Sequence, residues 1–166
     1  STDEYILATV HRTENVDDEG RFRGIISVIQ SFAEDASKRI IYPIHPRAAK
    51  QIDEFEIEIP ETIRLIEPQD FLDFLKLERN AHIVFTDSGG VQEETCILGV
   101  PCVTVRNNTE RPESVSVGAN MLAGTDPETI VNKGKEMVQR KTSWENPYSD
   151  GTAAEQIISY ISEDGV

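Results

Sequence analysis

Residues 83–98 decide the fold, and they read Ile83-Val-Phe-Thr-Asp-Ser-Gly-Gly-Val-Gln-Glu-Glu-Thr-Cys-Ile-Leu98. The short apolar run Ile83–Thr86 predicts a buried strand, and the glycine pair predicts a tight turn over Asp87–Gly90. A helix is predicted over Val91–Leu98, closed by Gly99 and Pro101. A strand, a turn and a helix in this order form the repeating unit of an α/β protein.

The same alternation extends over the whole chain. Apolar runs predict further strands at Tyr5–Val10, Arg39–Ile44, Ile63–Ile66, Cys102–Val105 and Asn120–Ala123. Amphipathic spacing predicts helices over Phe22–Ala33, Ala48–Phe55, Asp70–Leu75, Asp126–Arg140 and Thr152–Ser162. Pro46 is expected to place a turn after the second strand. No linker-like stretch divides the chain, so residues 1–166 are expected to form one domain with a doubly wound parallel sheet.

Composition narrows the class of protein. The chain has 166 residues and is 38% hydrophobic, which is enough for a sizeable core. No apolar run approaches the ~20 residues that span a bilayer, so a membrane protein is not expected. The excess of 30 acidic over 16 basic residues gives a net charge of −14, which argues against nucleic-acid binding. An acidic surface poor in lysine is typical of a high-salt cytoplasm, although mesophilic domains also reach this charge.

The termini and the cysteines bear on location. The first four residues, Ser1–Glu4, lack the positive and apolar regions of a signal peptide. Cys96 and Cys102 are too few for a disulfide framework or a metal site, and they are expected to be small buried side chains in a reducing cytosol. We therefore expect a cytoplasmic protein.

The carboxyl ends of the predicted strands gather the residues that could carry chemistry. In a doubly wound sheet, ligands bind outside these ends. The segments concerned are His11–Asn15, His45–Arg47, Glu67–Asp70, Asp87–Gly90 and Arg106–Glu113. They hold two of the three histidines and four of the ten arginines. His82 precedes its strand, at the opposite edge, and is interpreted as structural.

The turn at Ser88, Gly89 and Gly90 is a candidate phosphate site. Residues without side chains let backbone amides approach an anion, and the helix dipole favours negative charge there. The alternative is an ordinary tight turn with Ser88 as a helix cap. Glu93 or Glu94 could reach back to accept hydrogen bonds from a ribose diol, or could simply be solvated.

Histidines and arginines flank this turn. His11 could transfer a proton or stabilise a leaving phosphate, and His45 has the same placement; each could instead be a capping or packing residue. Arg111 suits bidentate phosphate binding, with a salt bridge to Glu110 or Glu113 as the alternative.

Six motifs occur in an order that resembles a known family. They are His11-Arg-Thr-Glu-Asn15, Pro43-Ile-His-Pro46, Thr86-Asp-Ser-Gly-Gly-Val-Gln-Glu-Glu94, Thr109-Glu-Arg-Pro-Glu113, Gly118-Ala-Asn120 with Gly124-Thr125, and Asn146-Pro-Tyr-Ser-Asp-Gly151. Together they resemble the C-terminal half of the non-hydrolysing UDP-N-acetylglucosamine 2-epimerases, over about residues 5–162. The resemblance implies a GT-B architecture, in which two Rossmann-like domains enclose the active site. This chain would be the second domain, which holds the nucleotide, and the N-terminal domain with its acid–base carboxylates is absent.

The resemblance also assigns roles to individual residues. Ser88, Gly89, Gly90 and Arg111 would bind the diphosphate, and Glu94 the ribose hydroxyls. His11 would be the catalytic histidine beside the diphosphate, adjoined by Arg12. The segment from Pro68 to Phe71 would hold the uracil ring, with Phe71 stacking on it, and His45 would be a further histidine of the cleft.

The activity implied is the interconversion of UDP-GlcNAc and UDP-ManNAc, by anti elimination of UDP to 2-acetamidoglucal and re-addition. No metal and no cofactor is implied, and the full-length enzyme would be a homodimer. A GT-B glycosyltransferase and a non-catalytic module that binds UDP-sugars are the alternatives. A chain that begins directly before a strand, without an initiator Met, is expected to be a domain fragment.

Overall fold

The computed structural model describes residues 4–140, 143–148 and 150–163 of the chain. Six strands form one sheet in the order β3-β2-β1-β4-β5-β6, and all neighbours pair in parallel. The order reverses beside β1, which confirms the doubly wound sheet. The strands are β1 (Tyr5–Thr9), β2 (Ile40–Pro43), β3 (Ile63–Ile66), β4 (Ala81–Thr86), β5 (Cys102–Thr104) and β6 (Asn120–Leu122).

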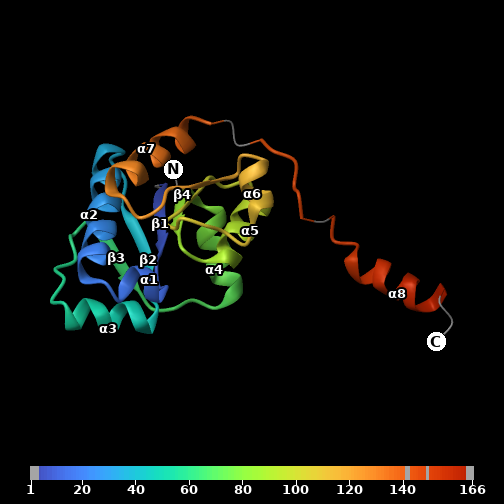
Figure 1. Ribbon diagram of the computed structural model, residues 1–166, viewed down its shortest axis with the longest axis horizontal. Coiled ribbons are helices and arrows are strands. Elements are labelled where there is room, and N and C mark those ends of the chain that lie inside the picture. Colours follow the sequence, from blue (N-terminus) through green and yellow to red (C-terminus); the bar gives the residue numbers. More distant parts are fainter. Residues whose placement is uncertain (1–3, 141–142, 149, 164–166) are drawn as a thin grey trace.

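Helices cover both faces of this sheet (Figure 1). The described helices are α1 (Thr13–Val16), α2 (Glu19–Asp35), α3 (Pro46–Glu54), α4 (Phe71–Arg79), α5 (Gly89–Leu98), α6 (Pro112–Ser116), α7 (Pro127–Gln139) and α8 (Ala153–Glu163). Successive strand residues point to opposite faces, so Ile6 and Ala8 pack in the core under α2 and α7. Leu7, between them, packs with Val91 of α5 in a smaller core on the other face.

Pro46 does not end the regular structure as expected; it begins α3. Its ring occupies the first turn of the helix, where a backbone N–H would have no partner, and its fixed φ suits a helix start. His45 caps the same helix, because its Nδ1 accepts a hydrogen bond from the Arg47 backbone N–H at 3.1 Å. The helix predicted over Ala48–Phe55 therefore starts two residues earlier, and His45 is fixed at the end of β2.

Two short helices were not predicted. α1 has 4 residues and α6 has 5, so neither is long enough to show helical periodicity in the sequence. Both occupy segments that the sequence analysis treated as polar loops. In the last of the six motifs, Ser149 lies outside the described residues.

The last helix, α8, lies apart from the sheet (Figure 1). Its apolar side chains are 60–75% exposed, and they are Ile157, Ile158, Tyr160 and Ile161. An amphipathic helix gains stability by burying such a face, so α8 has an uncovered packing surface. Within the described part of the chain, no helix combines the length and the apolar character needed to cross a membrane.

Candidate functional site

The fully buried Asp87, at the end of β4, organises the strand ends. Its carboxylate accepts hydrogen bonds from the backbone N–H groups of His11, at 3.0 and 3.1 Å, and Arg12, at 2.9 Å. The Asn15 side chain also donates to Asp87, at 2.9 Å, and to the Val105 carbonyl, at 3.1 Å. These bonds satisfy a buried charge and hold the ends of β1, β4 and β5 together. The sequence analysis assigned no role to Asp87.

The turn after Asp87 presents the start of α5. Ser88 is in the N-cap position of α5, as expected if the turn were an ordinary one with Ser88 as a helix cap. However, its side chain makes no capping hydrogen bond within the described residues. Its backbone N–H donates to the Thr86 hydroxyl at 2.9 Å. A Cβ added to Gly90 would be in van der Waals contact with the Glu94 side chain, at 3.7 Å. Ser88 and Gly90 both line the pocket described below. The geometry thus leaves the Ser88 hydroxyl and the first amides of α5 available to an anion.

His11 and His45 lie side by side at the ends of β1 and β2. Their rings stack with centroids 5.0 Å apart and an interplanar angle of 24°. His11 Nδ1 lies 3.5 Å from the Asp87 carboxylate. Burial lowers the pKa of His11 below its usual value, against the opposing charge of Asp87. His11 is therefore neutral at pH 7 in this state, and an incoming negative charge would favour its protonation.

A pocket of about 300 Å³ opens between these histidines and the turn. Five of the predicted site residues line it: His11, His45, Ser88, Gly90 and Glu94. Pro68 and Gln69, from the segment expected to hold the uracil ring, also line it. Phe71 is 63% exposed and does not line the pocket, whereas Phe74, one turn later, does. The other lining residues are Thr9, Pro43, Ile44 and Val91.

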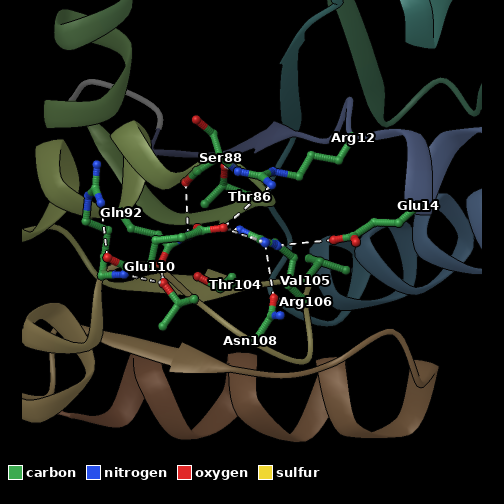
Figure 2. Close-up of polar contacts among 12 residues, drawn as sticks. Arg12, Glu14, Thr86, Ser88, Gln92, Thr104, Val105, Arg106, Asn108 and Glu110 are labelled. Carbon is green, nitrogen blue, oxygen red and sulfur yellow. Dashed lines mark hydrogen bonds and ion pairs between the residues drawn. The ribbon is translucent and has the colours of Figure 1, made fainter.

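Arg106 anchors the loop that follows β5. Although only 4% exposed, it pairs with Glu14 at 3.2 Å and with Glu110 at 2.9 Å. It also donates to Asn108 at 3.1 Å, and Figure 2 shows its guanidinium between these partners. The hydrogen bonds from Arg106 lower the pKa of Glu110 to about 2, so Glu110 is ionised throughout the neutral range. The role of Arg106 is to fix this loop, which the sequence did not reveal.

A second set of contacts joins the same loop to α5. The amide oxygen of the buried Gln92 accepts hydrogen bonds from Thr109 and, at 3.2 Å, from Asn120. The Thr109 hydroxyl in turn accepts from the Arg111 backbone N–H at 2.9 Å. Arg111 is thereby held beside the N-terminal half of α5.

Arg12 and Arg111 do not line the pocket, and each lies beside an acid. Arg12 lies 3.8 Å from Glu110. Arg111 Nε lies 2.6 Å from the Glu93 carboxylate, and its Nη1 donates to the Glu110 carbonyl at 3.0 Å. The alternative role of Arg111, a salt bridge to Glu110 or Glu113, was predicted with the wrong partners, because the carboxylate beside it is that of Glu93. Both arginines are about one-third exposed and can still turn toward an anion at the turn.

His82, Cys96 and Cys102 lie away from the pocket. His82 lies inside β4 rather than before it as expected, and its Nδ1 is 3.2 Å from the Glu4 carboxylate. Both cysteines are buried and unpaired, as expected of small buried side chains.

Known proteins are similar to this chain in sequence and in fold. The family model described as UDP-N-acetylglucosamine 2-epimerase matches residues 1–162. The UDP-N-acetylglucosamine 2-epimerase of Methanocaldococcus jannaschii is 45% identical over 164 residues, which are 96% of this chain and 45% of that protein. A crystal structure of the M. jannaschii UDP-GlcNAc 2-epimerase in complex with UDP-GlcNAc and UDP superimposes with a TM-score of 0.90 at 45% identity, covering 97% of this chain and 46% of the other. The chain thus spans about half the length of the curated relatives it matches.

A more distant likeness concerns the fold alone. The E. coli heptosyltransferase WaaC with ADP is 19% identical, with a TM-score of 0.55 over 84% of this chain and 45% of that one. Together with the epimerase structures, it confirms a Rossmann-like α/β half of the GT-B type.

Proposed function

The chain belongs to the UDP-N-acetylglucosamine 2-epimerase family, and we propose on this basis that it is the nucleotide-binding half of an enzyme that interconverts UDP-GlcNAc and UDP-ManNAc. The observation that carries the proposal is the pocket at the strand ends, where the start of α5 meets two stacked histidines. Arg12 and Arg111 come from the segments that follow β1 and β5. A site of this kind suits a diphosphate.

The pocket has a group for each part of UDP. The diphosphate binds at Ser88, Gly89 and Gly90, where backbone amides and a hydroxyl donate hydrogen bonds, and Arg12 and Arg111 neutralise its charge. Glu94 accepts hydrogen bonds from the ribose hydroxyls at the pocket wall.

The uracil ring lies further along the same pocket. It is held by the backbone from Pro68 to Phe71, and the exposed Phe71 ring, which lies outside the pocket lining, stacks on it. His45 completes the wall on the side of β2.

The reaction divides between two halves. The proton at C2 of the sugar is too weakly acidic for direct exchange, so the enzyme removes it while the C1–O bond to UDP breaks, giving 2-acetamidoglucal. Return of UDP to C1 and of a proton to the other face of C2 completes the epimerisation. In this half, His11, protonated in the complex because the bound diphosphate raises its pKa, stabilises the negative charge that grows on the departing diphosphate. The base for the C2 proton belongs to the N-terminal half, and no metal is required.

Two observations support a second half. The chain spans about 45% of the length of its relatives, and α8 exposes an apolar face. A helix of this kind suits packing against the other domain. We place the complete enzyme in the cytoplasm, where the unpaired thiols of Cys96 and Cys102 stay reduced, and we expect it to be a homodimer.

The test is to incubate UDP-GlcNAc in D₂O with the 166-residue chain and, separately, with the complete protein, and to follow deuterium at C2 by NMR. We expect exchange and UDP-ManNAc with the complete protein, and neither with the chain alone, because a base must lie within about 3 Å of the C2 proton. In the complete protein, His11→Ala should lower kcat more than it raises KM, since the charge that it stabilises peaks in the transition state. Exchange by the chain alone would show that the base lies in these residues. UDP binding without epimerisation by the complete protein would favour a binding module, and consumption of an added acceptor a glycosyltransferase.

A further inference from the structure

Glu78, near the end of α4, is a buried acid that the proposed mechanism does not use. Its relative exposure is 0%, as is that of Asp87. The carboxylate of Asp87 accepts hydrogen bonds from three residues, whereas neither oxygen of Glu78 receives a donor from any other described residue. An isolated carboxylate in such a place would carry a large desolvation penalty, so an ionised Glu78 would need a partner that compensates its charge.

The group that faces Glu78 is a second carboxyl, that of Glu94 on the neighbouring α5. Helices α4 and α5 pack against each other, and a side-chain hydrogen bond with Glu94 is among the causes that raise the pKa of Glu78. Carboxylates only accept hydrogen bonds, so this contact requires a proton on one of the two. Burial, reinforced by the charge of Glu94, raises the pKa of Glu78 to about 9, which places the proton on Glu78 at neutral pH.

The remaining groups around Glu78 do not compete for this role. Cys102 of β5 is a neighbouring titratable group, and burial raises the pKa of its thiol to about 12, so it stays uncharged. The Tyr5 hydroxyl of β1 donates to the Leu77 carbonyl at 2.7 Å and is thereby occupied.

Glu94 connects this buried acid to the pocket. It lines the pocket wall, and its Oε1 is 3.7 Å from the position of a Cβ built on Gly90. It therefore reaches back along α5 from the buried layer toward the phosphate turn. A single hydrogen bond from Glu78 would leave the other lone pairs of the Glu94 carboxylate directed at the pocket.

We propose that Glu78 is a positioning residue: as a neutral carboxylic acid it donates its O–H to the Glu94 carboxylate and holds that carboxylate aligned for the two ribose hydroxyls. The inference rests on the proposed function, because it takes the ligand of Glu94 to be a ribose diol. It adds a residue outside the pocket to the recognition of the nucleoside.

The test compares UDP with 2′,3′-dideoxy-UDP, which lacks the diol, by calorimetric titration of the full 166-residue chain. Glu78→Leu removes the donor with little change in size, and Glu78→Gln keeps an N–H donor at all pH values. We expect Glu78→Leu to weaken UDP binding about tenfold, the value of one charge-assisted hydrogen bond, and to leave the dideoxy ligand unaffected. Glu78→Gln should bind both ligands as the unchanged chain does. Equal weakening of both ligands by Glu78→Leu, or no weakening of either, would overturn the inference.

Two further arms keep the result decisive. Glu94→Ala should abolish the preference for UDP over the dideoxy ligand. An unchanged preference in Glu94→Ala, or no UDP binding by the unchanged chain, would refute the proposed function itself. If Glu78→Leu does not fold, the pH profile replaces it. The affinity of the unchanged chain for UDP should fall as the pH rises through about 9, where Glu78 ionises, and that of Glu78→Gln should fall less. Parallel profiles would overturn the inference.

Discussion

Replacing Glu78 by Gln should stabilise the protein at neutral pH, and the gain should grow with pH. The pKa of Glu78 rises from an ordinary 4.5 to about 9 on folding, so the folded state keeps a proton that the unfolded state loses. The contribution of Glu78 to the free energy of unfolding is therefore fully present below pH 4.5. It is lost progressively as the pH rises from there through about 9. Neutral pH lies about 2.5 units above the unfolded value, and at ~1.36 kcal/mol per unit the penalty is about 3 kcal/mol. Gln has a similar shape and does not ionise, so it avoids this penalty.

Urea unfolding of both proteins at pH 5, 6, 7 and 8 measures the effect. The difference in the free energy of unfolding should widen in favour of Glu78→Gln by about 1.4 kcal/mol per pH unit. Changes in packing add a constant at every pH, so the slope isolates the ionisation of Glu78. Glu61→Gln, at an exposed position before β3, is the matched control and should show no such slope. A difference that stays constant from pH 5 to 8 would refute a buried, protonated Glu78.

Three further predictions concern the pocket and the core. Arg111→Ala should weaken UDP binding about ten- to a hundredfold in calorimetric titrations, the value of a charge-assisted contact; unchanged affinity would remove Arg111 from the diphosphate site. The affinity for UDP-GlcNAc, whose diphosphate diester does not titrate near neutrality, should rise as the pH falls from 8 to 6, because burial lowers the pKa of His11 in the free state and the diphosphate raises it in the complex. His11→Ala should flatten this profile, and a persisting slope would assign the proton elsewhere. Gly134→Ala should lower the free energy of unfolding by about 1–3 kcal/mol in urea melts, since its Cβ would lie 2.7 Å from Phe32 and 3.0 Å from Phe85. Gly24→Ala, where the nearest atom is 3.8 Å away, is the control, and equal stability of the two variants would contradict this packing.

The parts of the fold that sequence could predict are those set by local patterns. Apolar runs and a glycine pair predict the strand Ile83–Thr86 and the helix Val91–Leu98, and the structure begins these elements two residues earlier, at Ala81 and Gly89. Asp70 opens α4 as predicted, because its side chain caps that helix. Pro46 was misread because a proline after a strand fits a turn and a helix start equally well, and only the chain that follows decides between them.

The site was predictable where it depends on strand ends, and not where it depends on tertiary contacts. His11, His45, Ser88, Gly90 and Glu94 meet because parallel strands end at one edge of the sheet. The pairing of Arg111 with Glu93 joins two segments that are distant in sequence, and no local pattern reveals it. The burial of the charged residues Asp87, Arg106 and Glu78 likewise follows from packing between elements, which composition cannot show.

The central claim is that this half binds UDP at the carboxyl ends of its strands, and a UDP titration of the ¹⁵N-labelled chain followed by two-dimensional NMR tests it most directly. The account predicts that the amides of Ser88, Gly89 and Gly90 shift most, together with those of His11 and Arg111. Residues of the cationic pocket at the opposite edge, which include Lys38, Arg39 and Arg64, should not respond. Shifts centred on that opposite pocket, or none at the glycine turn at saturating UDP, would contradict it.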